Sequence, residues 1–212
     1  MGFGTVRALQ RSVGNAAVSQ VVGRPRNVVQ RALIEPTGNV KYPTVKLDEA
    51  DKKKSREAIL YIKGSDVYKM YTKEATANAV LSEMAKAAGH GVPVPPWKSY
   101  KANYTDDNNG SKQVTVIHSR RVEGTFFQLS KHGGAKTFIN AVNGMSDVTR
   151  MRRIRHQLAA AKDAGISDPQ GMISNDPQEG VMFFLDIHTG GTASGIDDLI
   201  RAVDERIKAF TP

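Results

Sequence analysis

The segment GISDPQGMISNDPQEGVMFFLDIHTG, residues 165–190, contains three aspartates, and the first and last of them, Asp168 and Asp186, lie eighteen residues apart. Asp168 lies in a turn-forming stretch with Gln170 close behind it, and a strongly apolar run leads into Asp186. Turn residues between strand-forming runs are typical of a β-hairpin. We therefore expect a hairpin with a carboxylate at each end, although either aspartate alone would be ordinary at a turn or a strand end.

The composition narrows the class of protein. A chain of 212 residues with 40% hydrophobic content can bury one substantial core or two small lobes. It has no cysteine, so neither disulfides nor thiolate zinc sites are available, which fits a reducing cytosol. We find no apolar run of about eighteen residues to span a membrane and no secretion signal. A net charge of +9 suits an acidic partner, such as nucleic acid, anionic lipid or a phosphate-rich small molecule.

The first 35 residues differ from the rest of the chain. They are basic, rich in glutamine and poor in large apolar residues, with a short amphipathic pattern followed by Gly, Pro and Arg. Such a segment is typical of a mobile leader or a docked helix. We expect the folded domain to occupy residues 36–212.

The first half of that domain has the pattern of a small antiparallel sheet with one helix. In VYKMYT, Val67, Lys69 and Tyr71 alternate with Tyr68 and Met70, so the two sets are expected on opposite faces of a strand. The other expected elements are strands at 44–47, 58–64 and 113–121, a helix at 73–89, an extended proline-rich connector at 91–97 and a loop at 103–112.

The second half is expected to be mainly helical after Gly124, apart from the strand pair of the hairpin. Ser146 and Asp147 can cap the middle helix, and Gly165 can end it. The expected helices cover residues 136–145, 146–165 and 195–210.

This order resembles the protein kinase-like fold, an α+β architecture of two lobes. The resemblance implies a small antiparallel-sheet N-lobe with one helix at 36–118, a hinge at 119–124 and a mainly helical C-lobe at 125–212. Phosphoryl transfer in such enzymes depends on positioning and electrostatics, and it uses ATP and Mg²⁺. The resemblance therefore implies an ATP- and Mg²⁺-dependent phosphotransferase.

The resemblance also implies roles for single residues. Lys69 stands where the lysine that holds the nucleotide phosphates is expected, and Glu83 or Glu74 would brace it. Asp168 would orient the acceptor hydroxyl. Gln170 and Asp186 would hold Mg²⁺, a cation that prefers oxygen ligands.

Three motifs of ordinary kinases are absent from the sequence. No Gly-x-Gly-x-x-Gly precedes Lys69, so the phosphates would be covered either by Gly64 and Ser65 or by the lysine-rich run of residues 52–55. Ile166 and Ser167 precede Asp168 in place of His-Arg, and Asp-Ile-His replaces Asp-Phe-Gly. The sequence still resembles a group of very small bacterial effector kinases, which have an Asp-x-Gln catalytic loop.

One family of such effectors phosphorylates the host heat-shock chaperone of the Hsp-ninety class. The resemblance therefore implies a toxin-like serine/threonine protein kinase with a host protein substrate. The N-terminal LQRSVGN also resembles a short tag in proteins encoded with contractile injection systems. It implies loading onto a bacterial secretion apparatus through Leu9, Gln10, Arg11, Gly14 and Asn15. The protein would be cytosolic in producer and host, and would be exported without a signal peptide.

Two other readings stay open. RMRRIRHQ, residues 150–157, could bind nucleic-acid phosphates, but neither a helix-turn-helix nor an aromatic platform accompanies it. The same arginines surround Met151 and Ile154, as in an ordinary amphipathic helix. A pseudokinase would bind nucleotide without turnover. His156 and His188 match no metal-ligand spacing.

Overall fold

The computed structural model describes residues 31–38, 41–53, 55, 57–107, 110–176, 181–191 and 195–210. In this part of the chain the protein is α+β, with two antiparallel sheets and four α-helices. The candidate tag and the rest of residues 1–30, together with Lys54, lie outside the described residues. No helix in the described ranges is long and apolar enough to cross a bilayer.

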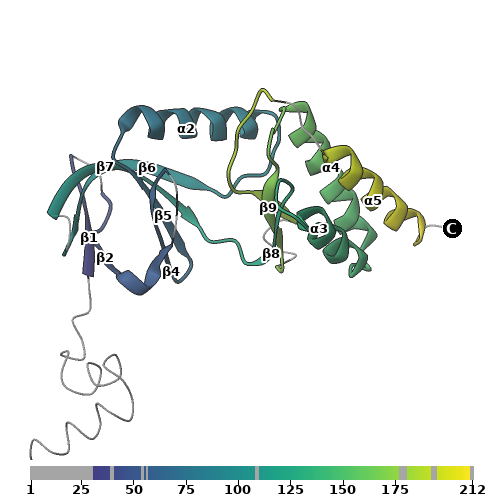
Figure 1. Ribbon diagram of the computed structural model, residues 1–212, viewed down its shortest axis with the longest axis horizontal. Coiled ribbons are helices and arrows are strands. Elements are labelled where there is room, and N and C mark those ends of the chain that lie inside the picture. The colour runs from purple at the N-terminus through teal and green to yellow at the C-terminus, as the bar shows by residue number, and fades with distance from the viewer. Residues whose placement is uncertain are drawn as a thin grey trace, which may run out of the picture.

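The main sheet has seven strands in the order β2-β1-β6-β7-β5-β4-β3 (Figure 1). In chain order they are β1 (Arg31–Pro36), β2 (Val45–Asp48), β3 (Lys52–Lys53), β4 (Ile59–Lys63), β5 (Asp66–Tyr71), β6 (Trp97–Asp106) and β7 (Gly110–Arg120).

The main sheet curls into a barrel-like shape. Its two edge strands, β2 and β3, are separated in the sequence only by the short 3-10 helix η1 (Glu49–Asp51). Because a chain spans at most about 3.6 Å per residue, those edges must lie close together. The Lys63 Nζ on β4 donates to the Lys46 carbonyl on β2 at 2.6 Å, which confirms the approach.

The inside of the curled sheet is packed with aromatic and aliphatic side chains. The hydroxyls of Tyr61 and Tyr104 lie 3.1 Å apart, and burial raises the pKa of Tyr104. Glu49 closes this end of the interior, because its carboxylate accepts from Tyr61 at 3.2 Å and from Lys52 at 3.3 Å. The buried set is Ala32, Ile34, Leu47, Tyr61, Tyr68, Met70, Tyr100, Ala102, Tyr104, Val114 and Val116.

Helix α2 (Glu74–Gly89) covers part of the outer face (Figure 1). Its Ala77 packs with Tyr71 of β5 and Ile117 of β7. Tyr68 and Met70 point into the interior, so the alternation expected for this strand is confirmed. Lys69 therefore lies on the outer face.

The second sheet has the order β10-β9-β8 and packs against three helices (Figure 1). The strands are β8 (Gly124–Gln128), β9 (Gln170–Ser174) and β10 (Met182–Phe184). The helices are α3 (Gly134–Asn143), α4 (Val148–Asp163) and α5 (Ile196–Lys208). Asp147 caps α4 by accepting from the Arg150 amide at 3.1 Å, and Met151 and Ile154 of α4 are fully buried.

Three expectations need correction. Strand β1 begins within the expected leader, yet Ile34 is fully buried and β1 pairs with both β2 and β6, so the domain begins no later than Arg31. Residues 103–106, expected in a loop, complete β6, and the turn there is shorter. After Gly124 the chain continues as β8 before any helix, because β8 supplies the third strand of the second sheet.

Candidate functional site between the two sheets

Asp168 and Asp186 lie at the two ends of the β9–β10 hairpin, as expected. Asp168 stands two residues before the start of β9, and Asp186 stands two residues after the end of β10. Backbone hydrogen bonds join the flanking segments: Ser167 N donates to His188 O at 3.0 Å, and Leu185 N donates to Gln170 O at 3.1 Å. These bonds hold the two aspartate-bearing loops side by side.

Lys69 reaches the loop that carries Asp186. Its Nζ donates to the Leu185 carbonyl at 3.2 Å, although the two residues are 116 positions apart. Leu185 directly precedes Asp186, so this hydrogen bond brings an ammonium of the main sheet to the loop that carries the Asp186 carboxylate. The contact also links the outer face of β5 to the hairpin.

The Asp186 side chain is exposed, and within the described ranges it makes no hydrogen bond or ion pair. Its negative charge nevertheless affects the pKa of Tyr71. Burial, and then the negative charges of Asp186 and Glu57, raise the pKa of Tyr71 to about 12. The charges of Asp186 and Glu57 thus both act on Tyr71.

Asp168 is held by three donors. Its Oδ2 accepts from Ser130 Oγ at 2.9 Å and from Gln128 Nε2 at 3.2 Å, and its Oδ1 accepts from the Ser130 amide at 3.3 Å. Gln128 is the last residue of β8, and Ser130 lies two residues beyond it. The sequence patterns did not reveal this strand. With 38 and 40 positions between the partners, no local pattern could have identified them. Gln170 begins β9 directly opposite Gln128 and is half-buried.

Glu83 is placed differently from the expectation that it braces Lys69. Its carboxylate accepts from the Thr189 amide at 2.6 Å and also from the Thr189 hydroxyl. The competing Glu74 pairs with Lys101 at 2.6 Å. Lys69 contacts neither carboxylate in the described structure, because its ammonium is bound by the Leu185 carbonyl and Glu83 lies over the segment beyond Asp186. Glu83 therefore anchors that segment to α2.

We expect this anchor to weaken in acid. The two Thr189 hydrogen bonds hold the pKa of Glu83 below its ordinary value of 4.5. A lowered carboxyl pKa adds stability that is present above the unfolded value and is lost as the pH falls through the folded value. Glu83→Ala should reduce the free energy of unfolding by about 1–2 kcal/mol at neutral pH, and the difference from wild type should shrink below the ordinary glutamate value.

Chemical denaturation at a series of pH values measures this difference. Glu205→Ala is the matched control, since Glu205 is an exposed residue of α5. An equal loss in both variants, or a loss that does not depend on pH, would show that Glu83 acts through packing and not through its charge.

Gly64 and Ser65 lie at the wrong end of their hairpin to cover anything bound at Lys69. They form the β4–β5 turn, where the Ser65 carbonyl accepts from the Arg121 amide at 2.7 Å. Lys69 is four residues further on, roughly 13 Å along an extended strand. The turn is therefore beside the connection to the second sheet, away from Asp186.

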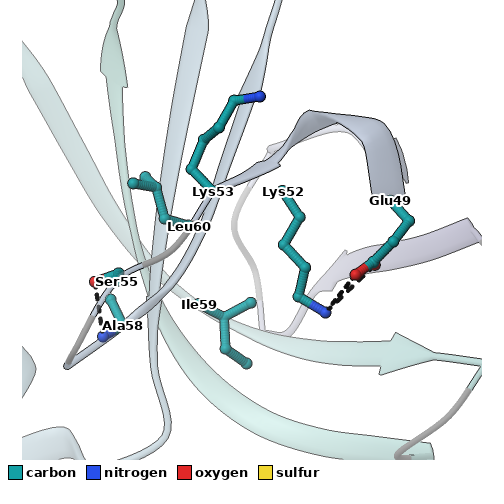
Figure 2. Close-up of a pocket in the computed structure, with 7 residues that line it drawn as sticks. All are labelled: Glu49, Lys52, Lys53, Ser55, Ala58, Ile59 and Leu60. Carbon is teal, nitrogen blue, oxygen red and sulfur yellow. Dashed lines mark hydrogen bonds and ion pairs between the residues drawn. The ribbon is translucent and has the colours of Figure 1, made fainter.

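The lysine-rich β3–β4 connection lies at the opposite end of the β4–β5 hairpin from the Gly64–Ser65 turn. Lys53 pairs with Leu60, and Leu60 pairs with Lys69, so these three side chains form a row on the outer face. A cavity of about 410 Å³ opens beside this connection (Figure 2), lined by Glu49, Lys52, Lys53, Ser55, Ala58, Ile59 and Leu60. Within it, Lys52 forms an ion pair with Glu49 at 2.9 Å. Of the two loops considered for covering phosphates, this one shares the Lys69 end of the sheet.

Both sheets carry partly exposed apolar side chains. On the main sheet, Leu60, Ile62 and Val67 share the outer face with Lys69. On the second sheet, Phe126, Met172 and Phe183 form one cross-strand row, which points away from the buried Phe127 and Phe184. Phe126 is 43% exposed. Each sheet thus presents a partly exposed apolar row on one of its faces.

Comparisons with protein-family models, with curated proteins and with solved structures found no match to the chain.

Proposed function

We propose that the protein is an ATP- and Mg²⁺-dependent phosphotransferase, in which the main sheet with α2 and the second sheet with its helices act as the two lobes of a kinase-like fold. The observation that carries the proposal is the hydrogen bond from Lys69 to the carbonyl that precedes Asp186. It brings a cation of the main sheet to the loop that carries Asp186, and backbone hydrogen bonds hold this loop beside the one that carries Asp168. Phosphoryl transfer needs a cation and carboxylates of this kind.

The residues present fit a small hard cation. Within the described ranges no three His, Cys, Asp or Glu side chains form a metal-binding group. Mg²⁺, however, is commonly held by one or two carboxylates together with phosphates and water. Asp186 and the Gln170 amide would hold the ion, which would supply charge stabilisation to the phosphates.

The remaining chemistry comes from the chain itself. The Lys69 ammonium would move from the Leu185 carbonyl to the nucleotide phosphates, a stronger, charge-assisted partner. The Asp168 carboxylate would orient the acceptor hydroxyl and receive its proton. The apolar rows on the two sheets would enclose the adenine ring, since nucleotide bases are bound largely by apolar contact.

The acceptor and the route of export are supported only by sequence motifs. We propose a host protein as substrate, with the Hsp-ninety-class chaperone as one candidate, because the Asp-x-Gln loop resembles that of the effector kinases. We propose export through an injection apparatus because LQRSVGN in the leader resembles a tag.

Binding of nucleotide without turnover is the second candidate. It is favoured by the position of Glu83, which is engaged by Thr189 and does not brace Lys69. Nucleic-acid binding has less support, because Met151 and Ile154 anchor α4 in the core and Arg155 pairs with Asp204 at 2.6 Å.

Incubation of the purified chain with Mg²⁺ and γ-labelled ATP in a eukaryotic lysate tests the proposal. We expect label in protein, and Lys69→Ala should lower transfer at least about tenfold because the phosphates lose a charged contact. Lys112→Ala, at an exposed site on β7, is the matched control. Label in RNA or small molecules would change the acceptor class, whereas nucleotide binding without transfer would favour the second candidate.

A further inference from the structure

Ser130 lies just after β8 with its side chain directed at Asp168. The Ser130 hydroxyl is 2.9 Å from Asp168 Oδ2, and the Ser130 amide is 3.3 Å from Oδ1, so backbone and side chain both hold the residue on this carboxylate. Gln128 Nε2 donates to Ser130 Oγ at 3.1 Å and to the same Oδ2. Ser130 is nevertheless exposed to solvent.

This geometry is the one expected of a hydroxyl that accepts a phosphoryl group. A catalytic-loop carboxylate works by accepting a hydrogen bond from the hydroxyl that is to be phosphorylated, at about 2.6–3.2 Å. The hydroxyl at that position in this structure belongs to the chain itself. We propose that Ser130 is a phosphate acceptor within the same molecule, an inference that rests on the proposed phosphotransferase function.

The reaction balances with ATP as the only co-reactant. The Ser130 Oγ attacks the γ-phosphorus, and a new Oγ–P bond forms. The bond between that phosphorus and the β,γ-bridging oxygen breaks, and its electron pair leaves with ADP. The hydroxyl proton passes to the Asp168 carboxylate and then to water.

The modification would change the site that makes it. A phosphoserine carries a charge of about −1.5 to −2 and no longer has a hydroxyl proton to donate. Beside Asp168 it would replace an attractive contact with repulsion between like charges. The phosphorylated Ser130 would leave Asp168, and the carboxylate would become accessible to the hydroxyl of another molecule.

Ser167 provides a matched control from the same loop. It is also exposed and directly precedes Asp168, but its hydroxyl donates to the His188 carbonyl at 3.4 Å and not to the aspartate. Two serines therefore lie beside one carboxylate, and only Ser130 presents its oxygen to it. The inference predicts phosphorylation of Ser130 and none of Ser167.

The test uses the full chain with Mg²⁺ and ATP and no other protein. Intact mass and peptide mapping should show one added phosphate on Ser130, formed at a rate constant that does not change with protein concentration. The phosphate should disappear in Ser130→Ala, persist in Ser167→Ala and move to the new hydroxyl in Ser130→Thr. Retention of wild-type circular dichroism would show that the variants fold.

The other outcomes count against the inference. If the chain releases ADP or labels another acceptor while Ser130 stays unmodified, Ser130 is not an acceptor, although the phosphotransferase proposal stands. Equal phosphate on Ser167, or a rate constant that rises with protein concentration, also contradicts transfer within one molecule. Absence of any nucleotide turnover would overturn both proposals.

Discussion

Asp186→Asn is expected to reduce phosphoryl transfer by about 100-fold or more, the usual loss when an electrostatic group of an active site is removed. The carboxylate is exposed, and it lies next to the Leu185 carbonyl that binds Lys69. An asparagine of the same shape keeps this geometry and removes only the charge. Steady-state transfer of label from γ-labelled ATP measures the loss.

Asp163→Asn is the control for that substitution. Asp163 ends α4 at an exposed position, so its loss of charge should leave transfer unchanged. Full activity of Asp186→Asn would remove Asp186 from the site. An equal loss in both variants would instead indicate a general effect of net charge.

Gly124→Ala is expected to lower the free energy of unfolding by about 3 kcal/mol or more, as in severe overpacking. A Cβ at Gly124 would meet the Ile173 carbonyl oxygen at 2.0 Å and Ser174 Cα at 3.0 Å. Both neighbours are backbone atoms, which cannot turn aside as a side chain can. The β8–β9 pairing should therefore open, and denaturation with urea measures the change.

Gly89→Ala is the matched control, because Gly89 ends α2 and a Cβ there would have nothing within 4 Å. Its stability should stay the same or rise by up to about 1 kcal/mol. If Gly124→Ala were as stable as this control, β8 would not pack against β9 as closely as the structure shows.

The sequence predicted elements whose signal is local. The alternation around Lys69 placed Tyr68 and Met70 on the opposite face from Lys69, and in the structure these two side chains point into the interior. Helices α2, α4 and α5 lie where composition, apolar periodicity and end signals predicted them. The hairpin between Asp168 and Asp186 also follows from turn residues and an apolar run. In each case the residues that determine the element lie close together in the sequence.

The sequence did not predict features that depend on distant pairing. Strand β1 is short and follows a basic segment, and only its pairing with β6, more than sixty residues later, explains the burial of Ile34. For the same reason the donors to Asp168 and the engagement of Glu83 by Thr189 were missed. Gly124 was expected only as the last residue of a hinge, whereas in the structure it leaves room for the backbone of β9.

The three-residue helix η1 between β2 and β3 has a consequence for how the protein behaves among other copies of itself. An open antiparallel sheet presents two rows of unpaired backbone groups on which further chains can assemble. Here the two outermost strands are brought together by η1, and one of them is only the dipeptide Lys52–Lys53. The main sheet thus offers little template for strand addition, which should favour solubility at high concentration.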